Sequence, residues 1–347
     1  MGGLSSEREV SLKSGKAVLE ALKFKNLEAV AIDIKGQDRN YVKDLLLSYD
    51  INLAFLALHG AFGEDGKLQA ILEEIGIPYT GSGLRASELA MDKIASRKVF
   101  EAGGLNTPKY CLLDKNHKNI RDFMALSSRK IGIPTESGQG RGKAIPPDKI
   151  FPLVIKPASG GSSIGLSIVD EPQTLREAIE TAFKYDRRVI AEEYIEGREM
   201  TVGIFEDAPL EAIEIKSKRR FFDYQAKYGP GQTEYIVPAP VSWEVMGLLK
   251  ETALKAHNLL GCSFFSRVDI ILDKTNKPFI LEVNTIPGFT ATSLLPKAAL
   301  AKGIAFPDLV ARISEAALSA GQRAVVGLPI AQAPAGAGLV CWLDSLR

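Results

Sequence analysis

The 347-residue sequence has few cysteines, almost no net charge and no long apolar run. Its three cysteines, Cys111, Cys262 and Cys341, are scattered and form no C-x-x-C pair, which argues against a disulfide framework and against a zinc site. With 43 basic and 42 acidic residues the formal net charge is +1, so no strong field exists for binding nucleic acid or an anionic membrane. This composition favours small-molecule chemistry in a reducing cytoplasm.

Segments that could enter a membrane are also missing. The first 15 residues contain no apolar core of a signal peptide, and no uninterrupted apolar run reaches the length of about 18 residues that a membrane helix needs. The nearest candidate, residues 324–343, is broken by two prolines, three glycines and Gln332. We therefore expect no membrane partner.

The length of the chain and the order of its segments favour an α/β protein of two or three domains. A helix is predicted from Ser6, where Ser6 and Glu9 form an S-x-x-E capping box before apolar residues at helical spacing. Residues 51–58 predict a buried strand that ends in the loop HGAFGEDG, a usual setting for a binding crevice. A further helix is predicted over residues 87–103.

The region 267–297 contains the most informative polar pattern. Two segments of alternating apolar residues, RVDIIL and PFILEVN, flank a polar turn and predict an antiparallel hairpin. If the pairing centres on residues 275–276, Asp269 lies opposite Glu282, and four polar side chains share one face. These four are Arg267, Asp269, Glu282 and Asn284. The opposite face, predicted to be core, carries Val268, Ile270, Leu281 and Val283.

The polar face of this hairpin has two interpretations. Two carboxylates and a carboxamide at cross-strand distance are hard oxygen ligands that suit Mg²⁺, which usually completes its shell with water and phosphate oxygens. A solvated face with an Arg–Asp ion pair is the alternative.

A second motif, FPLVIKPASGGSSIGLSIV, places Lys156 and a glycine- and serine-rich turn between two β-rich runs. The Walker pattern G-x-x-x-x-G-K-[ST] is absent, so a hairpin is predicted rather than a P-loop. Backbone N–H groups of such a turn can surround phosphate oxygens while Lys156 adds a point charge, although an ordinary structural hairpin fits the pattern equally well. Residues 114–150, rich in glycine, proline and serine, predict an exposed insertion.

Taken together, the motifs resemble the D-alanine:D-alanine ligases of the ATP-grasp superfamily over residues 1–318. The matching strings are GGLSSEREVS, HGAFGEDGKLQ, YTGSG, LAMDK, KPASGGSSIG, EEYIEGREMTVGI, FFDYQAKY, RVDIILD and LEVNTIPGFTATSLLPK. The resemblance implies an ATP-grasp fold with an N-terminal α/β domain (1–93), a central domain (94–191) and a C-terminal catalytic domain (192–318). Residues 319–347 have no counterpart and are predicted to be a low-complexity tail.

The resemblance also implies an activity, the ATP-dependent ligation of two D-alanines to D-alanyl-D-alanine for peptidoglycan synthesis. The first D-alanine would be activated as an acyl phosphate, which the amine of the second would attack. ATP is the implied co-substrate, two Mg²⁺ or Mn²⁺ ions are the implied cofactors, and a cytoplasmic homodimer is the implied form. Alternatives are a D-alanine:D-lactate or D-alanine:D-serine ligase of the same fold, or a catalytically impaired nucleotide-binding relative; Tyr228 argues against lactate, because lactate-using relatives typically carry histidine there.

The resemblance assigns roles to individual residues. The implied metal ligands are Asp269, Glu282 and Asn284. The implied ATP-binding residues are Arg97, Lys156, Glu192, Tyr194, Glu199, Phe221, Lys227 and Leu281. The implied catalytic residues are Glu7, Ser162, Tyr228, Arg267, Gly288 and Ser293. Substrate binding is implied for His59, Ser293 and Leu294.

Within this set the resemblance separates two substrate subsites. Glu7 would receive the ammonium group of the first D-alanine, with Ser162 and Tyr228 linked to it by hydrogen bonds. Arg267 and the backbone N–H of Gly288 would stabilise the oxyanion of the second step. The carboxylate of the second D-alanine would lie at Ser293 and the N–H of Leu294.

Three departures from the family pattern affect these expectations. The family has a short strand before the glycines at positions 2 and 3, so the first strand of the N-terminal sheet is expected to be missing. Arg97 stands where a lysine is usual and Lys98 lies beside it, which leaves open which of the two contacts phosphate. The tail is the third departure, and Phe222 replaces a common tyrosine.

Overall fold

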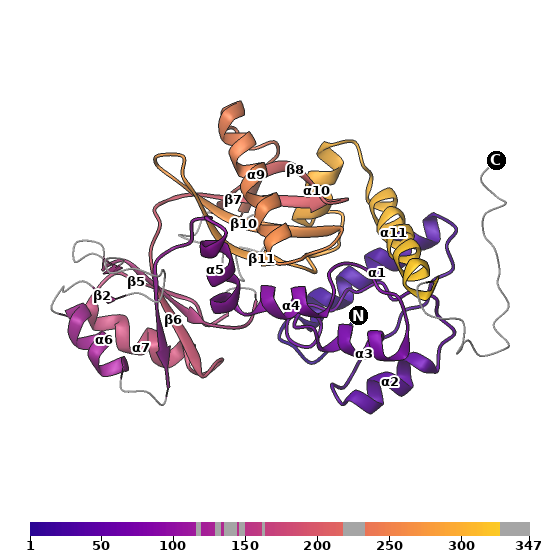
Figure 1. Cartoon of the computed structure of the whole chain (residues 1–347), viewed down its shortest axis with the longest axis horizontal. Coiled ribbons are helices and arrows are strands. Elements are labelled where there is room, and N and C mark those ends of the chain that lie inside the picture. Colours follow the sequence, from indigo (N-terminus) through magenta and orange to yellow (C-terminus); the bar gives the residue numbers. More distant parts are fainter. Residues whose placement is uncertain are drawn as a thin grey trace.

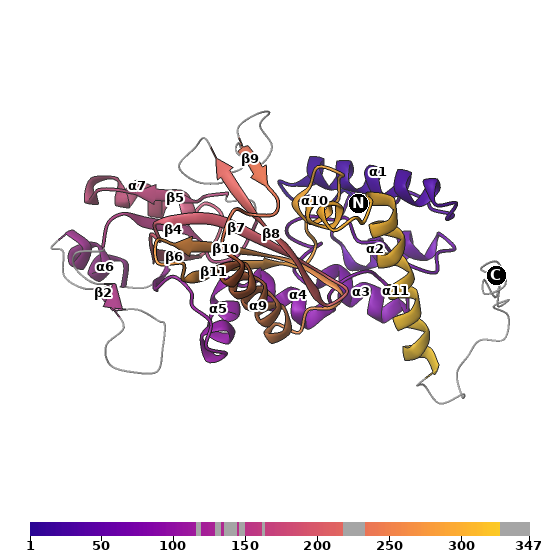
Figure 2. The ribbon, with the colours of Figure 1, turned by 90° about the horizontal axis from the view of Figure 1, so that it is seen from above.

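The computed structural model describes most of the chain (Figure 1). The described residues are 1–115, 119–128, 133–134, 144–145, 150–161, 164–217 and 233–326. Three regions follow one another along the sequence, and the C-terminal sheet lies between the central region and the N-terminal helices in both views (Figures 1 and 2). Ser162, Phe221, Phe222, Lys227 and Tyr228 lie outside the described residues, as do most of the predicted insertion and residues 327–347.

The N-terminal region contains four helices. The helices are α1 (Arg8–Phe24), α2 (Arg39–Leu47), α3 (Lys67–Ile75) and α4 (Leu84–Met91). Of these, α2 and α3 supply buried side chains to the region's own apolar core. Buried residues recur at helical spacing, as in α3, where Leu68, Ile71 and Leu72 face inward. These side chains join Leu56 and Leu58 in one core cluster.

The strand predicted over residues 51–58 is reduced to a single parallel bridge between Ala54 and Tyr79. The backbone hydrogen bonds between this run and residues 78–80 stop after Ala54. The N–H of Leu56 donates to the side-chain oxygen Oγ1 of Thr80 at 3.0 Å rather than to a backbone carbonyl. The prediction of a strand is therefore wrong, although the run is part of the core.

The first three residues lie against Ile34. Gly2 and Ile34 form a parallel bridge, and the N–H of Gly3 donates to the Ile34 carbonyl at 2.8 Å. The N–H of Ile34 in turn donates to the Met1 carbonyl at 3.0 Å. These contacts hold the segment that leads into α1.

The start of α1 differs from the prediction. The helix begins at Arg8 with Glu7 as its N-cap, and no side chain makes a capping hydrogen bond. The predicted box of Ser6 and Glu9 is therefore wrong. The hydroxyl of Ser5, one residue earlier, instead accepts the N–H of Glu7 at 3.2 Å.

The helix predicted over residues 87–103 is two helices, α4 and α5 (Lys93–Ala102). Asp92 separates them, because its backbone is extended and its side chain accepts the N–H groups of Ile94 and Ala95 at 2.9 and 3.0 Å. An ion pair of 3.1 Å joins the Asp92 carboxylate to Arg188, which belongs to the central region. The break places Lys93, in the first turn of α5, against Gly160 of the glycine- and serine-rich turn that follows Lys156.

The described residues of the central region form a four-stranded antiparallel sheet covered by two helices. The strand order is β1 (Tyr110–Asp114), β6 (Arg188–Glu193), β4 (Leu153–Pro157) and β5 (Ser167–Val169). The helices are α6 (Asn119–Ser128) and α7 (Pro172–Ala182), and a short pair, β2 (Ile133–Pro134) and β3 (Ala144–Ile145), lies beside them. β4 and β5 pair antiparallel, which confirms the hairpin predicted around the glycine turn.

In the C-terminal region, the described residues form a five-stranded antiparallel sheet and three helices. Its strand order is β11 (Pro278–Asn284), β10 (Phe265–Asp273), β7 (Gly197–Phe205), β8 (Ala208–Ser217) and β9 (Thr233–Ile236). The helices are α9 (Trp243–Leu259), α10 (Leu294–Ala301) and α11 (Phe306–Val326). α11 continues past residue 318, so the start of the predicted tail is helical.

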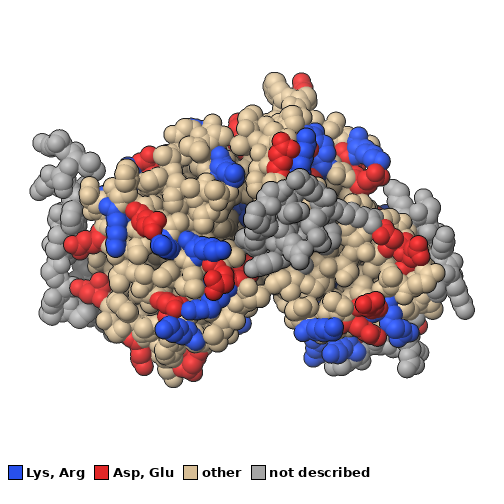
Figure 3. All heavy atoms as spheres, turned by 180° about the vertical axis from the view of Figure 1, so that it is seen from behind, with Lys and Arg blue, Asp and Glu red and all other residues tan. Residues whose placement is uncertain are grey.

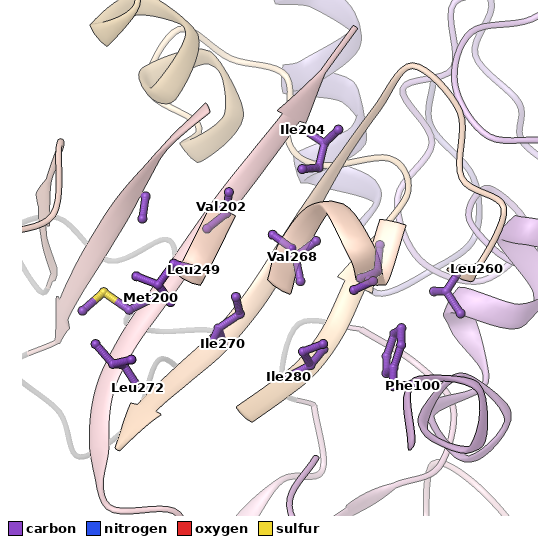
Figure 4. Close-up of a cluster of buried hydrophobic side chains, with 14 of the residues drawn as sticks. Phe100, Met200, Val202, Ile204, Leu249, Leu260, Val268, Ile270, Leu272 and Ile280 are labelled. Atoms are coloured by element: carbon purple, nitrogen blue, oxygen red, sulfur yellow. The ribbon is translucent and has the colours of Figure 1, made fainter. Parts of the chain in front are cut away.

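Alternate residues of β7 and β10 build a core on one face of this sheet (Figure 4). These residues are Met200, Val202, Ile204, Val268, Ile270 and Leu272. Leu249 from α9 and Phe100 from α5 pack against them and are fully buried. The intervening residues, among them Thr201, Arg267 and Asp269, therefore point to the other face.

A second core joins the N-terminal and C-terminal regions. Val18 and Ala21 of α1 lie in one cluster with Phe205, Leu295 and Leu309. α1 therefore packs directly against the region that carries α10 and α11, and both views show α1 beside α11 (Figures 1 and 2).

The distribution of charge and the character of the helices can be compared with the composition. Basic and acidic side chains are interspersed on the face seen in Figure 3, without a broad patch of one sign. Within the described ranges no helix is long and apolar enough to cross a bilayer, and most of the candidate segment 324–343 lies outside those ranges.

Candidate active site

The register of the β10–β11 hairpin is the predicted one at residues 267–269 and differs from it by one residue nearer the turn. Asp269 lies opposite Glu282, and Arg267 lies opposite Asn284. At these residues the alternation of apolar and polar residues and the assumed turn centre gave the right pairing, and a slip of one residue would have turned the polar set into the core.

A bulge changes one part of the prediction. The register shifts between Asp269 and Ile270, so that Ile270 pairs with Ile280 and Leu281 becomes the extra residue of β11. Ile280 is fully buried in the core, whereas Leu281 is only half buried. The placement of Leu281 on the core face was therefore wrong, and the bulge releases it from that face.

The polar face is an ordered, partly buried surface. Arg267 donates to Asp269 through Nε at 2.9 Å and through Nη2 at 2.7 Å, a bidentate contact. The hydroxyl of Thr201 donates to Asp269 Oδ1 at 2.7 Å. The Arg–Asp pair of the second interpretation is therefore present, but Arg267 is only 9% exposed and the face is partly buried rather than fully solvated.

The residues present fit a divalent cation by their chemistry. Glu282 and Asp269 supply carboxylates, and Asn284 Oδ1, which accepts the N–H of Ile286 at 3.0 Å, keeps a second lone pair. In the part of the chain that the structure describes, no three His, Cys, Asp or Glu side chains cluster for a metal, so the set depends on the carboxamide of Asn284.

A cavity of about 540 Å³ gathers predicted residues from distant parts of the sequence. It is lined by Glu7, His59, Arg267, Glu282, Asn284, Gly288, Ser293 and Leu294. Asp269 is not on the wall but contacts Arg267, which is. The structure thus brings together all of the described residues predicted for the two substrate subsites.

Glu7 lies in this cavity and depends on a neighbouring glycine. It is 8% exposed, and a Cβ placed on Gly60 would lie 2.7 Å from Glu7 Oε2. Gly60 also has φ of +76°, a backbone conformation that residues other than glycine rarely adopt. A Cβ on Gly161 would lie 3.2 Å from the same oxygen. The two glycines leave the space that Glu7 occupies, and sequence reasoning did not single them out.

His59 is held by protein atoms on both ring nitrogens. Nε2 lies 2.9 Å from Ser14 Oγ, and Nδ1 lies 3.1 Å from the carbonyl of Ile286 and 3.3 Å from Glu64 Oε1. Burial raises the pKa of Glu64, against the opposing effect of His59. His59 lines the cavity, but its ring nitrogens are directed at the protein, and its predicted role in substrate binding stays a prediction.

The N-terminus of α10 supplies donors for an anion. Ser293 is the N-cap but makes no side-chain capping bond, so its oxygen does not occupy the N–H groups of the first turn. Its hydroxyl instead accepts the N–H of Thr290 at 3.1 Å and lies 2.8 Å from Thr290 Oγ1.

A buried ion cluster marks the predicted nucleotide side of the site. Lys156 Nζ lies 2.8 Å from Glu192 Oε1, and Arg97 pairs with the other Glu192 oxygen. Burial lowers the pKa of Lys156 to about 8, although Glu192 opposes the shift. Burial alone would raise the pKa of Glu192, but Arg97 and Lys156 outweigh it and the pKa is lowered.

The same cluster distinguishes Arg97 from its neighbour. Arg97 is fully buried, whereas Lys98 is exposed. The guanidinium of Arg97 lies over the ring of Tyr110 at 5.1 Å, and its Nε and Nη1 have no hydrogen-bond partner among the described residues. Arg97 is therefore the residue that belongs to the buried cluster.

The remaining predicted nucleotide residues are partly described. Tyr194 follows β6, Glu199 lies on β7 and Leu281 lies on β11, all half buried. Phe221 and Lys227, like Ser162 and Tyr228, lie outside the described residues.

Lys93 is a residue that sequence reasoning missed. Its Nζ donates to the carbonyl of Gly160 at 2.5 Å and lies 3.2 Å from Glu282 Oε2. It therefore connects the glycine turn to the predicted metal face. The string LAMDK contained the signal, but a single lysine in a helical pattern is not distinguishable from a surface residue.

Comparisons with known proteins agree with this geometry. A family model described as "D-ala D-ala ligase C-terminus" matches residues 112–315, and one described as "D-ala D-ala ligase N-terminus" matches residues 41–82. The chain is 45% identical over 321 residues to the D-alanine–D-alanine ligase of Pelotomaculum thermopropionicum, across 92% of this chain and 95% of that protein.

Solved structures share the fold. The D-alanine–D-alanine ligase from Bacillus anthracis, complexed with ATP, matches with a TM-score of 0.74 and 33% identity over 93% of this chain and 97% of its own. The VanG D-Ala:D-Ser ligase from Enterococcus faecalis matches with a TM-score of 0.73 and 29% identity over 91% and 97%. These matches confirm the expected α/β fold. The chain belongs to the D-alanine–D-alanine ligase family.

Proposed function

We propose that the protein is an ATP-dependent ligase that joins two D-alanines to D-alanyl-D-alanine through an acyl phosphate, for peptidoglycan synthesis. The observation that carries the proposal is the cavity shared by Glu7, Arg267 and the N-terminus of α10. A buried carboxylate suits the ammonium group of one amino acid, and a helix N-terminus suits the carboxylate of another. The relative that is 45% identical is a D-alanine–D-alanine ligase by name.

In the first step the carboxylate of one D-alanine attacks the γ-phosphorus of ATP, and ADP leaves. Lys156 and Lys93 lie beside the glycine turn and supply positive charge for the phosphates. Expected partners of the adenine and ribose are Glu192 and Glu199, with Tyr194, Phe221 and Leu281 packing the ring. Lys227 is the second expected phosphate lysine.

Asp269, Glu282 and Asn284 would hold divalent cations, either Mg²⁺ or Mn²⁺. Two bound ions would neutralise phosphate charge that otherwise repels the attacking carboxylate. Before binding, Lys93 lies 3.2 Å from Glu282 and Arg267 lies 2.7 Å from Asp269, so cations of the protein stabilise these carboxylates.

In the second step the amine of the other D-alanine attacks the acyl carbon, and inorganic phosphate leaves. Arg267 and the N–H of Gly288 stabilise the oxyanion that develops. The bidentate contact to Asp269 fixes the plane of the Arg267 guanidinium, so little reorganisation is needed. Glu7, with Ser162 and Tyr228 as its expected partners, holds the first substrate.

The test is phosphate release by the purified protein with ATP, Mg²⁺ and D-alanine, with the product identified by mass spectrometry. L-alanine is the control for stereochemistry, and D-serine and D-lactate are the competing second substrates. We expect D-alanyl-D-alanine as the main product. Absence of D-alanine-dependent phosphate release would contradict the proposal, and preferred formation of a mixed product would move it to the D-serine or D-lactate class.

We further propose a homodimer located in the cytoplasm. Support comes from large exposed apolar side chains on the N-terminal region, such as Phe24 and Leu47, which are 75% and 54% exposed. Light scattering during gel filtration tests the dimer, and cell fractionation tests the location.

A further inference from the structure

A buried hydrogen-bond chain connects α1 to the loop of residues 285–289. Ser14, on α1, is fully buried, and its Oγ lies 2.9 Å from His59 Nε2. The same oxygen accepts the N–H of Phe289 at 3.3 Å. On the other side of the ring, His59 Nδ1 lies 3.1 Å from the carbonyl of Ile286. Two residues of the N-terminal region thus bind two backbone groups of the C-terminal loop.

The chemistry of these groups fixes the direction of each hydrogen bond. The Ile286 carbonyl can only accept, so His59 Nδ1 carries the hydrogen and donates. In the neutral ring Nε2 is then an acceptor, and the Ser14 hydroxyl must donate to it. The lone pairs of Ser14 Oγ remain for the N–H of Phe289, which has to donate. With the ring neutral, this arrangement satisfies every group of the hydrogen-bond chain.

The bound backbone groups lie on either side of Gly288. Ile286 precedes the Pro287–Gly288 peptide and Phe289 follows it, so the N–H of Gly288 lies between two fixed points. We propose that Ser14 is a positioning residue, which with His59 holds the N–H of Gly288 where the oxyanion of the ligation reaction develops. This inference rests on the proposed function, because Gly288 matters only if that oxyanion forms.

The loop has a separate apolar anchor, which makes the effect of Ser14 testable. The ring of Phe289 packs edge to face against Phe55 and Phe265, each with centroids 5.4 Å apart. Loss of the Ser14 hydroxyl therefore leaves the loop docked but frees its backbone to shift. A shift near 1 Å at a catalytic group costs about 10²-fold in rate.

The experiment compares Ser14→Ala with Ser11→Ala. Ser11 is also fully buried on α1, one turn away, but its hydroxyl donates to the Ala57 carbonyl at 2.5 Å and accepts the N–H of Gly2 at 2.8 Å. Both variants lose a buried hydroxyl with two partners, so both should lose similar thermal stability. Only Ser14→Ala removes a contact to the loop.

We expect kcat for D-alanyl-D-alanine to fall about 10- to 100-fold in Ser14→Ala, with KM for ATP changed less than about twofold, since only the loop moves. Ser11→Ala should keep kcat within about twofold of the wild type. His59→Gln should lower kcat similarly, and the double variant with Ser14→Ala should be little worse, because one unit is already broken.

Equal kcat values for Ser14→Ala and Ser11→Ala would overturn the inference and leave the proposed function intact. A wild-type protein without D-alanine ligation would overturn both. If Ser14→Ala does not fold, the pair Ser14→Cys and Ser11→Cys makes the same comparison, since a thiol keeps the size but is a weak donor. A kcat loss specific to Ser14→Cys would then support the role, and equal values would refute it.

Discussion

The buried ion cluster predicts an unusual pH dependence of ATP binding. Lys156 has a pKa of about 8 because burial disfavours its charged form. A lysine carries its charge below its pKa, so the positive charge offered to phosphate is present at pH 7 and is lost as pH rises through about 8. An exposed lysine would keep its charge to about pH 10.

The magnitude follows from the fraction of charged lysine. If only protein with charged Lys156 binds ATP well, the apparent Kd scales as 1 + 10 raised to the power of pH minus pKa. With a pKa of about 8 this factor is about 1.1 at pH 7 and about 11 at pH 9, so affinity should fall about tenfold between these pH values.

Isothermal titration calorimetry with a non-hydrolysable ATP analogue and Mg²⁺, from pH 6.5 to 9.5, measures this dependence. Lys156→Arg is the control, because a guanidinium keeps its charge over the whole range, although its different geometry should weaken binding at pH 7. A flat profile for the wild type would refute the shifted pKa. An equal slope in Lys156→Arg would assign the dependence to another group.

Three substitutions test other parts of the site. Glu282→Gln keeps shape but removes a charge from the metal face, so turnover at saturating Mg²⁺ should fall about 10²-fold with little change in melting temperature; near-normal turnover would refute the assignment. Gly60→Ala places a Cβ 2.7 Å from Glu7 Oε2 and should raise KM for D-alanine. Gly76→Ala is the control for backbone strain, because Gly76 has a similar φ of +71° and a Cβ there would meet no atom within 4 Å. Equal effects of the two variants on KM would contradict the role of Glu7. Lys93→Met should weaken ATP binding while Lys98→Met, at an exposed site, should not; unchanged binding in both would remove Lys93 from the site.

How much of this site could be predicted depends on the range of the interactions. The pairing of Asp269 with Glu282 followed from a period of two around a polar turn, which is local information. The bulge at Leu281 did not, because Phe279, Ile280 and Leu281 are all apolar and the pattern does not indicate which of them is the extra residue. Asp92 separates α4 from α5 by capping Ile94 and Ala95, which is a local signal, but its ion pair with Arg188, 96 residues away, is not local. Local propensity contains no information about such a partner.

The ion pairs of Lys156 and Lys93 were beyond local prediction for the same reason, whereas the pair of Arg267 with Asp269, two residues apart, was among the expectations. All three pairs have a common logic. Each cation that would meet a phosphate or an oxyanion is held by a carboxylate: Lys156 by Glu192, Lys93 by Glu282 and Arg267 by Asp269. Because an isolated buried charge is costly, these pairs allow the cations to be placed before any anion arrives. Removing one carboxylate therefore leaves an uncompensated cation, so substitutions of Glu192 or Asp269 should affect folding as well as catalysis. Glu282, whose side chain is 27% exposed, should separate the two effects best.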